Sequence, residues 1–505
     1  MVVRKTQRHV RCRSICDSDA CGELIFGAGS FILTVPAVPP DEMPPVSDTS
    51  LSPAKQQVFR AQPGENTLLW TVWFTYGAFY FCRTNISAAV PGLKESVDAG
   101  GLGLTATEIG YILGATKVAY AIGQLINGQF SEQLAPRKLL AIGMFGTALL
   151  NVLFGFGTAL YFLIFMWACN GYSQSLGWTP CVRVLANWIP VSRRGKVIGL
   201  IGTGYQVTAV ATYVVSGQAA SYLGWRGAMF VPAGIMVASA VIMLVFLEER
   251  PVAAEQDSDN AGPGTEPTNE DAANSFPAAH PPSPSSSVRV SGNDPQNSVK
   301  ENFLLTITNP SLWILGIALG LLNACRYGFL DWGLTHLKEV QETGVGKAAL
   351  KYAVLPLGAI AGAYLAGWAT DRFFGSRRAP VTCILLIALA LLSLTYDTVA
   401  RTSVPLTMVL LVMIGFCIYG PQVLLVGTAP ADLARKGTSA AAAGFVNCMG
   451  YVGAASGDYF TGRTLDMYGW EQAIFMWAAW AVGAAIAAGL LWNVSASPET
   501  RTTAT

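Results

Sequence analysis

Long apolar stretches dominate the chain, and their lengths indicate membrane spans. A transmembrane helix needs about 20 consecutive, mostly apolar residues, and stretches of that length recur twelve times in the sequence. The pattern therefore predicts an all-α membrane protein with twelve transmembrane helices. The predicted spans are 68–90, 107–130, 138–157, 159–182, 196–221, 226–248, 311–334, 349–370, 379–398, 404–428, 438–462 and 470–493.

A polar segment separates the first six spans from the last six. Residues 250–305 are rich in Ser, Pro, Asn, Asp and Glu, and such a composition cannot bury enough apolar surface to become ordered. We therefore expect a disordered cytosolic linker between an N-terminal six-helix half, 65–249, and a C-terminal six-helix half, 306–496.

The two ends of the chain are expected to be tails, 1–64 and 497–505. Residues 22–38 are mildly apolar but follow acidic residues, not the basic flank of a targeting signal. We therefore favour a disordered or poorly ordered N-terminal tail over a targeting segment.

Basic residues in the short loops predict the orientation in the membrane. Loops after even-numbered spans carry more Lys and Arg than the other loops, and the positive-inside rule makes these loops and both termini cytoplasmic. Ala- and Gly-rich helices with short outer loops favour the inner membrane of a bacterium. The basic loop residues are Arg137, Lys138, Arg193, Arg194, Lys196, Arg372, Arg377, Arg378, Arg435 and Lys436.

The two halves repeat each other's landmarks in the same order. Arg83 in the first span corresponds to Arg326 in the seventh, and Lys94-Glu95 corresponds to Lys338-Glu339. An even number of spans in each half makes the repeats parallel. Parallel repeats are related by an axis along the membrane normal, and the substrate site lies between them near the midplane.

Composition excludes several other functions. Of the residues, 52% are hydrophobic and 12% are charged, and the net charge of +1 creates no field that would attract nucleic acid. The ten Cys form no CxxC pair and the three His stand apart, so we expect neither a metal site nor a disulfide framework. No nucleophile–base pair or phosphate-binding Gly loop is present, so we expect no enzyme and no cofactor.

Two arginines are the most informative charged residues within the spans. A charge inside a span costs at least about 2.5–3.5 kcal/mol and is a functional hypothesis by default. The repeat predicts that Arg83 and Arg326 face each other across a central cavity, where a dianionic phosphoryl group would neutralise both through bidentate contacts. The alternative is pairing with nearby acids. Asp331 lies five residues after Arg326, but the first span offers no acid.

Polar side chains on the same helix faces are candidates to complete the site. Tyr76 and Tyr80 lie seven and three residues before Arg83, so they share its helix face. Their hydroxyls could donate hydrogen bonds to phosphate, although such aromatics are also common in membrane helices.

A second set lies on the second span. Lys117, Tyr120 and Gln124 are spaced by three and four residues, which places them on one face. We expect Lys117, as an unpaired lysine within a span, to face a wet cavity. Asp458 and Arg463 in the eleventh span are expected to pair with each other.

Several motifs resemble the organophosphate:phosphate antiporters of the major facilitator superfamily. Residues 76–85 are similar to that family's first helix, 171–181 to its fourth-helix signature, and 326–332 to the seventh helix of bacterial glycerol-3-phosphate transporters. Tyr419, within Ile418-Tyr419-Gly420-Pro421, and Tyr451, within Gly450-Tyr451, fit helices ten and eleven. The resemblance covers residues 65–495.

The resemblance implies a fold, a mechanism and a binding pair. Twelve helices in two halves would rock around the bound anion, and Arg83 and Arg326 match the family's phosphoryl-binding arginines. Exchange of a small phosphorylated metabolite for inorganic phosphate would be driven by the phosphate gradient, without ATP or sodium. The family's fold also implies a monomer in the lipid bilayer.

Departures from the family pattern surround that pair. Tyr205 occupies the place of a helix-five histidine, Gln124 that of a helix-two lysine, Asn323 that of a tyrosine, and Pro356 that of an acid. Lys117, on the same face as Gln124, could replace the missing charge. The arginine pair is thus retained, whereas the residues around it differ from the family pattern. A receptor for external sugar phosphate and a facilitator for another organic anion remain open alternatives.

Overall fold

A computed structural model of the chain describes residues 64–249, 304–375, 377–434 and 438–492. The predicted tails and linker lie almost entirely outside the described residues. The described chain is helical throughout, as predicted. The N-terminal group of helices comprises α1 (Glu65–Ala78), α2 (Ile86–Lys94), α3 (Ala106–Gln133), α4 (Pro136–Phe156), α5 (Leu160–Gln174), α6 (Trp178–Trp188), α7 (Val191–Leu223) and α8 (Gly227–Phe246).

The C-terminal group contains the remaining helices. They are α11 (Pro310–Tyr327), α12 (Gly333–Val340), α13 (Val345–Tyr352), α14 (Leu355–Phe373), α15 (Arg378–Thr402), α16 (Val404–Val423), α17 (Ala429–Leu433), α18 (Ser439–Tyr468) and α19 (Trp470–Gly489).

Every predicted span coincides with one helix or with consecutive helices interrupted by a short irregular turn. Within the described ranges, nine helices are long and apolar enough to cross a membrane. Three predicted spans are not among these nine. The first and fourth are each broken, between α1 and α2 and between α5 and α6, and the eleventh, α18, is 30 residues long but less apolar. Breaks of this kind occur within a membrane only where the freed backbone groups find partners in the protein.

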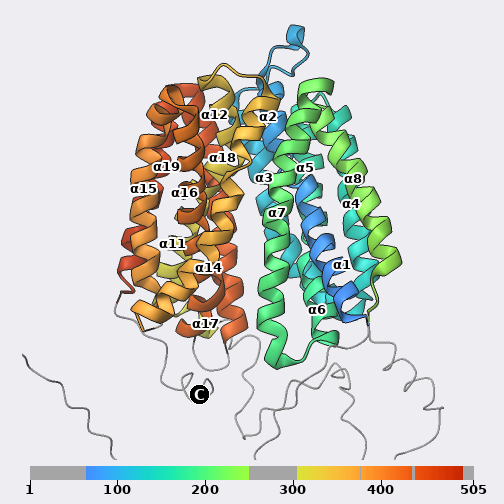
Figure 1. Cartoon of the computed structure of the whole chain (residues 1–505), viewed down its shortest axis with the longest axis vertical. Helices are drawn as coiled ribbons and strands as arrows, with labels where there is room; N and C mark the ends of the chain where they lie inside the picture. The colour runs from blue at the N-terminus through green and yellow to red at the C-terminus, as the bar shows by residue number, and fades with distance from the viewer. Residues whose placement is uncertain (1–63, 250–303, 376, 435–437, 493–505) are drawn as a thin grey trace, which may run out of the picture. The chain divides into compact units, whose positions relative to one another are not determined.

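The two groups of helices stand side by side and meet most closely at one end. Figure 1 shows α2 and α12 together at the upper end, whereas the ribbons diverge toward α6 and α17. The α3–α18 and α7–α13 contacts join the groups. The end that carries α2 and α12 is the one that the loop charges predict to be external, and we call it the external end.

Small residues allow α3 and α18 to approach closely. A Cβ added to Gly110 would lie 2.8 Å from the carbonyl oxygen of Asp458, and one added to Gly462 would collide with the carbonyl of Ala106. Small residues at helix contacts let backbones pack closely in membranes. This packing brings a polar side chain of α3 within reach of α18.

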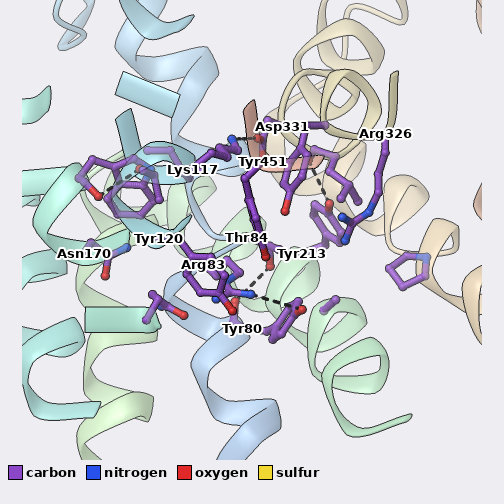
Figure 2. Close-up of a pocket in the computed structure, with 18 of the residues that line it drawn as sticks. Tyr80, Arg83, Thr84, Lys117, Tyr120, Asn170, Tyr213, Arg326, Asp331 and Tyr451 are labelled. Atoms are coloured by element: carbon purple, nitrogen blue, oxygen red, sulfur yellow. Dashed lines mark hydrogen bonds and ion pairs between the residues drawn. The ribbon is translucent and has the colours of Figure 1, made fainter. Parts of the chain in front are cut away.

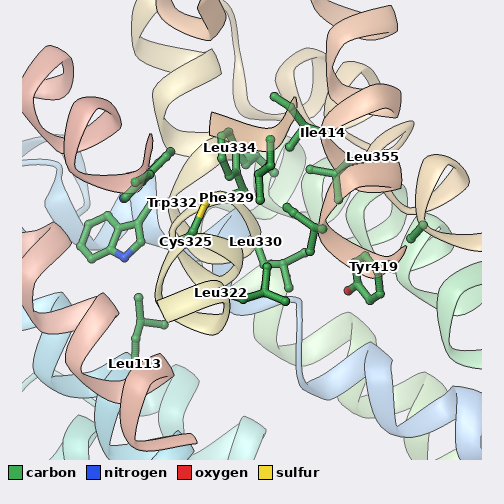
Figure 3. Packing of buried hydrophobic residues seen from close by; sticks show 14 of the residues in the cluster. Leu113, Leu322, Cys325, Phe329, Leu330, Trp332, Leu334, Leu355, Ile414 and Tyr419 are labelled. Carbon is green, nitrogen blue, oxygen red and sulfur yellow. The ribbon is translucent and has the colours of Figure 1, made fainter. Parts of the chain in front are cut away.

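Apolar side chains fill the centre of the C-terminal group. Leu322, Cys325 and Phe329 are completely buried and pack with Leu355 and Ile414 from neighbouring helices. Figure 3 shows these side chains around the turn that follows α11. The turn carries Asp331, and Arg326 lies on the last turn of α11 just before it, so the core fixes the position of both.

Polar contacts join the two groups at the external end. The Lys94 ammonium lies 2.7 Å from a Glu339 carboxylate oxygen, and the Lys338 ammonium lies 2.6 Å from one of Glu95. The two Lys-Glu motifs of the sequence repeat therefore pair reciprocally. The Trp470 indole also donates to Glu339, at 2.6 Å.

Asp466 of α18 caps the N-terminus of α3 from the other group. Its carboxylate accepts hydrogen bonds from the backbone N–H groups of Ala106 at 2.9 Å and Thr107 at 2.7 Å. These N–H groups have no partner within their own helix. The external end is thus closed by contacts that require both groups.

Candidate functional site

A cavity lies between the two groups of helices, with an empty volume of about 740 Å³ including its opening. Figure 2 shows Arg83 and Arg326 beside it, and they come from different groups of helices. The residues that line it are Tyr80, Arg83, Thr84, Ile86, Thr116, Lys117, Tyr120, Trp167, Asn170, Gln174, Ala209, Tyr213, Arg326, Tyr327, Leu330, Asp331, Pro356, Tyr419 and Tyr451.

The break in the first span presents Arg83 to the cavity. The chain leaves α1 for a short 3₁₀ helix, Phe79–Cys82, and Arg83 follows it directly. The amides of Asn170 and Gln174 donate to the carbonyl of Cys82 at 3.1 and 3.2 Å. Side chains of α5 therefore replace the helical hydrogen bonds that the break removes, which explains why an amide lies in the fourth-helix motif.

Tyrosine rings surround the Arg83 guanidinium. Its central carbon lies 4.4 Å from the ring centroid of Tyr120 and 5.0 Å from that of Tyr80. Aromatic faces attract a cation through their quadrupole but do not neutralise its charge. The positive charge of Arg83 therefore remains available to a ligand.

Arg326 has an equivalent environment in the C-terminal group. Its guanidinium lies 4.8 Å from the Tyr327 ring centroid and 4.9 Å from that of Tyr419, and it donates to the Tyr419 hydroxyl at 3.2 Å. Its Nε is buried without a hydrogen-bond partner. Within the described part of the chain neither Arg83 nor Arg326 forms an ion pair, so the cavity holds two guanidiniums without a neutralising carboxylate.

The acid considered as a partner for Arg326 is engaged elsewhere. Asp331 lies on a π-helical turn, Gly328–Trp332, directly after α11, and such turns are frequent at functional sites. Its carboxylate lies 2.5 Å from the Lys117 ammonium, which also lies 2.5 Å from Asp458. Figure 2 shows the contact between Lys117 and Asp331. Lys117 does line the cavity, but the expectation that it is unpaired was wrong.

The predicted pairing of Asp458 with Arg463 was also wrong. Asp458 is fully buried against Lys117, whereas Arg463 is exposed and donates to the Tyr459 hydroxyl at 3.1 Å. Residues five apart on an α-helix differ by about 140° in direction. The two side chains therefore leave opposite faces of α18.

Six further candidates lie in or beside the cavity. Tyr80, Tyr120, Tyr419 and Tyr451 line it. The Tyr205 ring stacks on Tyr80 with centroids 4.9 Å apart, and Tyr76 packs edge-on against both rings, at 6.2 Å from Tyr80 and 6.0 Å from Tyr205. Tyr76 and Tyr205 therefore pack behind Tyr80, one of the two tyrosines that contact Arg83.

The two amide candidates bond to protein groups. Gln124 donates to the Tyr120 hydroxyl at 3.0 Å and accepts from Asn447 of the other group at 3.0 Å. Asn323 donates to the carbonyl of Gly450 at 3.1 Å and is not among the lining residues. Asn323 thus links α11 to α18 and does not face the cavity.

Some lining residues were missed at the sequence level. Tyr327 follows Arg326 directly, and its ring lies 4.7 Å from the Lys117 ammonium as well as beside that arginine. Tyr213 donates to the carbonyl of Leu330 at 3.1 Å, a group of the π-helical turn. Tyr213 lies two turns after Tyr205, and that spacing could have identified it.

Comparisons with known proteins agree with this architecture. The family described as Major Facilitator Superfamily matches residues 72–458 and 340–505. A solved bacterial homologue of the human lysosomal transporter Spinster, inward-facing and unoccupied, is similar with a TM-score of 0.67 at 14% identity, over 87% of this chain and 100% of that one.

Sequence relatives span nearly the whole chain. A probable hexose phosphate transport protein of Chlamydia muridarum is 28% identical, over 90% of this chain and 96% of the relative. The glycerol-3-phosphate transporter of Bacillus subtilis is 28% identical over 85% and 92%. The membrane sensor protein UhpC of Escherichia coli is 26% identical over 80% and 87%.

Proposed function

The chain belongs to the major facilitator superfamily, and on that premise we propose that it exchanges a small organophosphate for inorganic phosphate by alternating access. Its relatives include the hexose phosphate and glycerol-3-phosphate transporters. It is a multi-pass membrane protein of a transporter family and not an enzyme.

One observation carries the choice of ligand. Arg83 and Arg326 line the same cavity, one from each group of helices, and neither forms an ion pair in the described part of the chain. Two uncompensated guanidiniums repel each other, and a phosphoryl dianion between them would remove that repulsion through bidentate hydrogen bonds. A phosphoryl group is common to inorganic phosphate and every organophosphate, which is the requirement for exchange at one site.

The arrangement of the two groups supports the transport cycle. We take the N-terminal and C-terminal groups as the two halves that rock around the bound anion, with the linker and both termini in the cytoplasm of a bacterium. The contacts at the external end close the site on that side. Transport requires these contacts to break and re-form while a single chain, acting as a monomer, carries one anion at a time.

Phosphate self-exchange tests the proposal directly. Liposomes that contain the protein and unlabelled phosphate should take up radiolabelled phosphate, and sugar phosphates or glycerol phosphates outside should compete. Arg326→Lys keeps the charge but removes the bidentate fork, so we expect exchange to fall about 10- to 100-fold. Arg463→Lys, a matched change at an exposed arginine of α18, should leave exchange unchanged.

Two other results of the exchange assay would favour a different function. A folded protein that binds phosphate or sugar phosphate without exchanging it would be a receptor, a candidate favoured by the similarity to the membrane sensor of Escherichia coli. Exchange of another organic anion without phosphate competition would refute the organophosphate assignment.

A further inference from the structure

A buried cluster beside the phosphate site carries one more negative charge than positive. Lys117 is flanked by Asp331 and Asp458, each 2.5 Å from its ammonium nitrogen. The exposed fractions of the three side chains are 8%, 7% and 0%. One ammonium cannot neutralise two carboxylates, and uncompensated charge inside a membrane is strongly unfavourable. Arg83 and Arg326 line the same cavity but form no ion pair with either acid in the described part of the chain.

The surroundings of Asp458 supply no second cation. Its Oδ1 is fully buried without a hydrogen-bond partner, and the indole of Trp332 faces the carboxylate from the π-helical turn. On the α11 side the Tyr327 ring lies over the Lys117 ammonium. On the α19 side the Trp477 indole is bonded to Thr461. Among the described residues, Lys117 is the only cation that contacts the two acids.

We propose that this cluster is a proton-binding site and that it holds one proton, on Asp458, whenever the external end is closed. A neutral carboxylic acid is far less costly to bury than a carboxylate. With one proton added, the cluster consists of one ammonium, one carboxylate and one neutral acid, and its net charge is zero.

The positions of the three residues link this proton to alternating access. Lys117 belongs to α3 of the N-terminal group, whereas Asp331 and Asp458 belong to the C-terminal group. Parting of the groups at the external end would separate the lysine from both acids and admit water. All three side chains would then be ionised near neutral pH. Closing the external end therefore takes one proton from solution, and opening it releases one.

This linkage has a definite sign and magnitude. Because the closed state binds one more proton than the open state, a lower pH favours the closed state. The closed-to-open ratio should change by up to tenfold per pH unit while one proton is exchanged. The linkage holds whichever anion the protein carries.

Distances between spin labels across the external end can measure that ratio. Suitable positions are Ala99→Cys and Lys347→Cys, exposed residues of the two groups at this end. Cys12, Cys16, Cys21 and Cys448 are first replaced by Ser. In lipid without substrate, the short-distance population should grow as the pH falls from about 8 to about 5.

Variants of the cluster give opposite predictions. Asp458→Asn and Asp331→Asn each leave one lysine with one carboxylate, so either variant should abolish the pH dependence. Lys117→Gln leaves two carboxylates that both need a proton, so the dependence should steepen toward 100-fold per unit. A lysine with a purely structural role would not steepen the response. Two neutral variants are used, so that failure of one to fold leaves the other informative.

The control is His336, a buried titratable residue of α12 near the external end. His336 is buried and bonded to Asp397 at 2.7 Å, so His336→Gln should retain the response. An unaltered protein without pH dependence, or a response that survives in both aspartate variants but disappears in His336→Gln, overturns the proposal. Neither outcome bears on phosphate exchange, because the measurement uses no substrate.

Discussion

Asp466→Ala should open the external end because it removes a helix cap that one group provides to the other. The carboxylate accepts hydrogen bonds from two backbone N–H groups at the start of α3, at 2.9 and 2.7 Å, and from the Thr107 hydroxyl at 2.5 Å. Loss of an N-cap costs about 0.5–2 kcal/mol, and the charge at a helix N-terminus adds about 0.3–1 kcal/mol. The bonds are partly exposed, so we take about 1–2 kcal/mol for the sum.

That energy acts on the conformational equilibrium because the cap exists only when the two groups meet. A change of about 1–2 kcal/mol corresponds to a shift of about 5- to 30-fold in the closed-to-open ratio. The same pair of spin labels at positions 99 and 347 reads this shift as growth of the long-distance population. Asp466→Asn keeps an oxygen acceptor and loses the charge, so its shift should be smaller.

The control is an acid at the same end that caps no helix of the other group. Asp98 is exposed on a short 3₁₀ turn of the N-terminal group, and Asp98→Ala should leave the distances unchanged. An unchanged distribution in Asp466→Ala, or an equal shift in Asp98→Ala, would refute the reasoning that the cap holds the external end closed.

Three further predictions follow from the same structure. Lys94→Glu should shift the closed-to-open equilibrium toward the open state by about 0.5 kcal/mol, because the ion pair is partly exposed. Adding Glu339→Lys should restore the spin-label distances of the unaltered protein. Gly110→Ala should lower the thermal stability and favour the open state at a cost of about 1–3 kcal/mol, since its new methyl group would collide with α18. Gly234→Ala, which meets open space, is its control in the same melting assay. Gln174→Ala should destabilise the purified protein by about 1–3 kcal/mol in thermal unfolding, because the carbonyls at the break of the first span lose a donor.

Much of the fold could be predicted from hydropathy because a bilayer leaves few alternatives. Backbone groups in lipid must be satisfied within a helix, so apolar length alone predicted the position of every span. The arginine pair could be inferred for a similar reason. A charge inside a span needs a function, and the repeat related Arg83 to Arg326.

The partners of the remaining charges were not predictable from one helix at a time. Lys117 is paired with Asp331 and Asp458, which are far away in the sequence, through a contact between α3 and α18 that depends on glycines. Asp458 was predicted to pair with Arg463 because the two residues are close in sequence. That prediction did not take into account that residues five apart on a helix point in directions about 140° apart. Asn323, near Arg326 in sequence, turns toward the Gly450 carbonyl because α18 crosses α11 there.

The reciprocal contacts of the Lys-Glu motifs have a consequence for the origin of the chain. Lys94 meets Glu339 and Lys338 meets Glu95, so each motif offers one cation and one anion to the equivalent motif. In an isologous interface between two identical subunits, residue i contacts j and j contacts i. A single six-helix unit with one Lys-Glu motif could therefore form the same two ion pairs with a second copy of itself. Fusion of two copies of the gene for such a unit would preserve both ion pairs at the external end without any compensating substitution. The two halves could then diverge elsewhere.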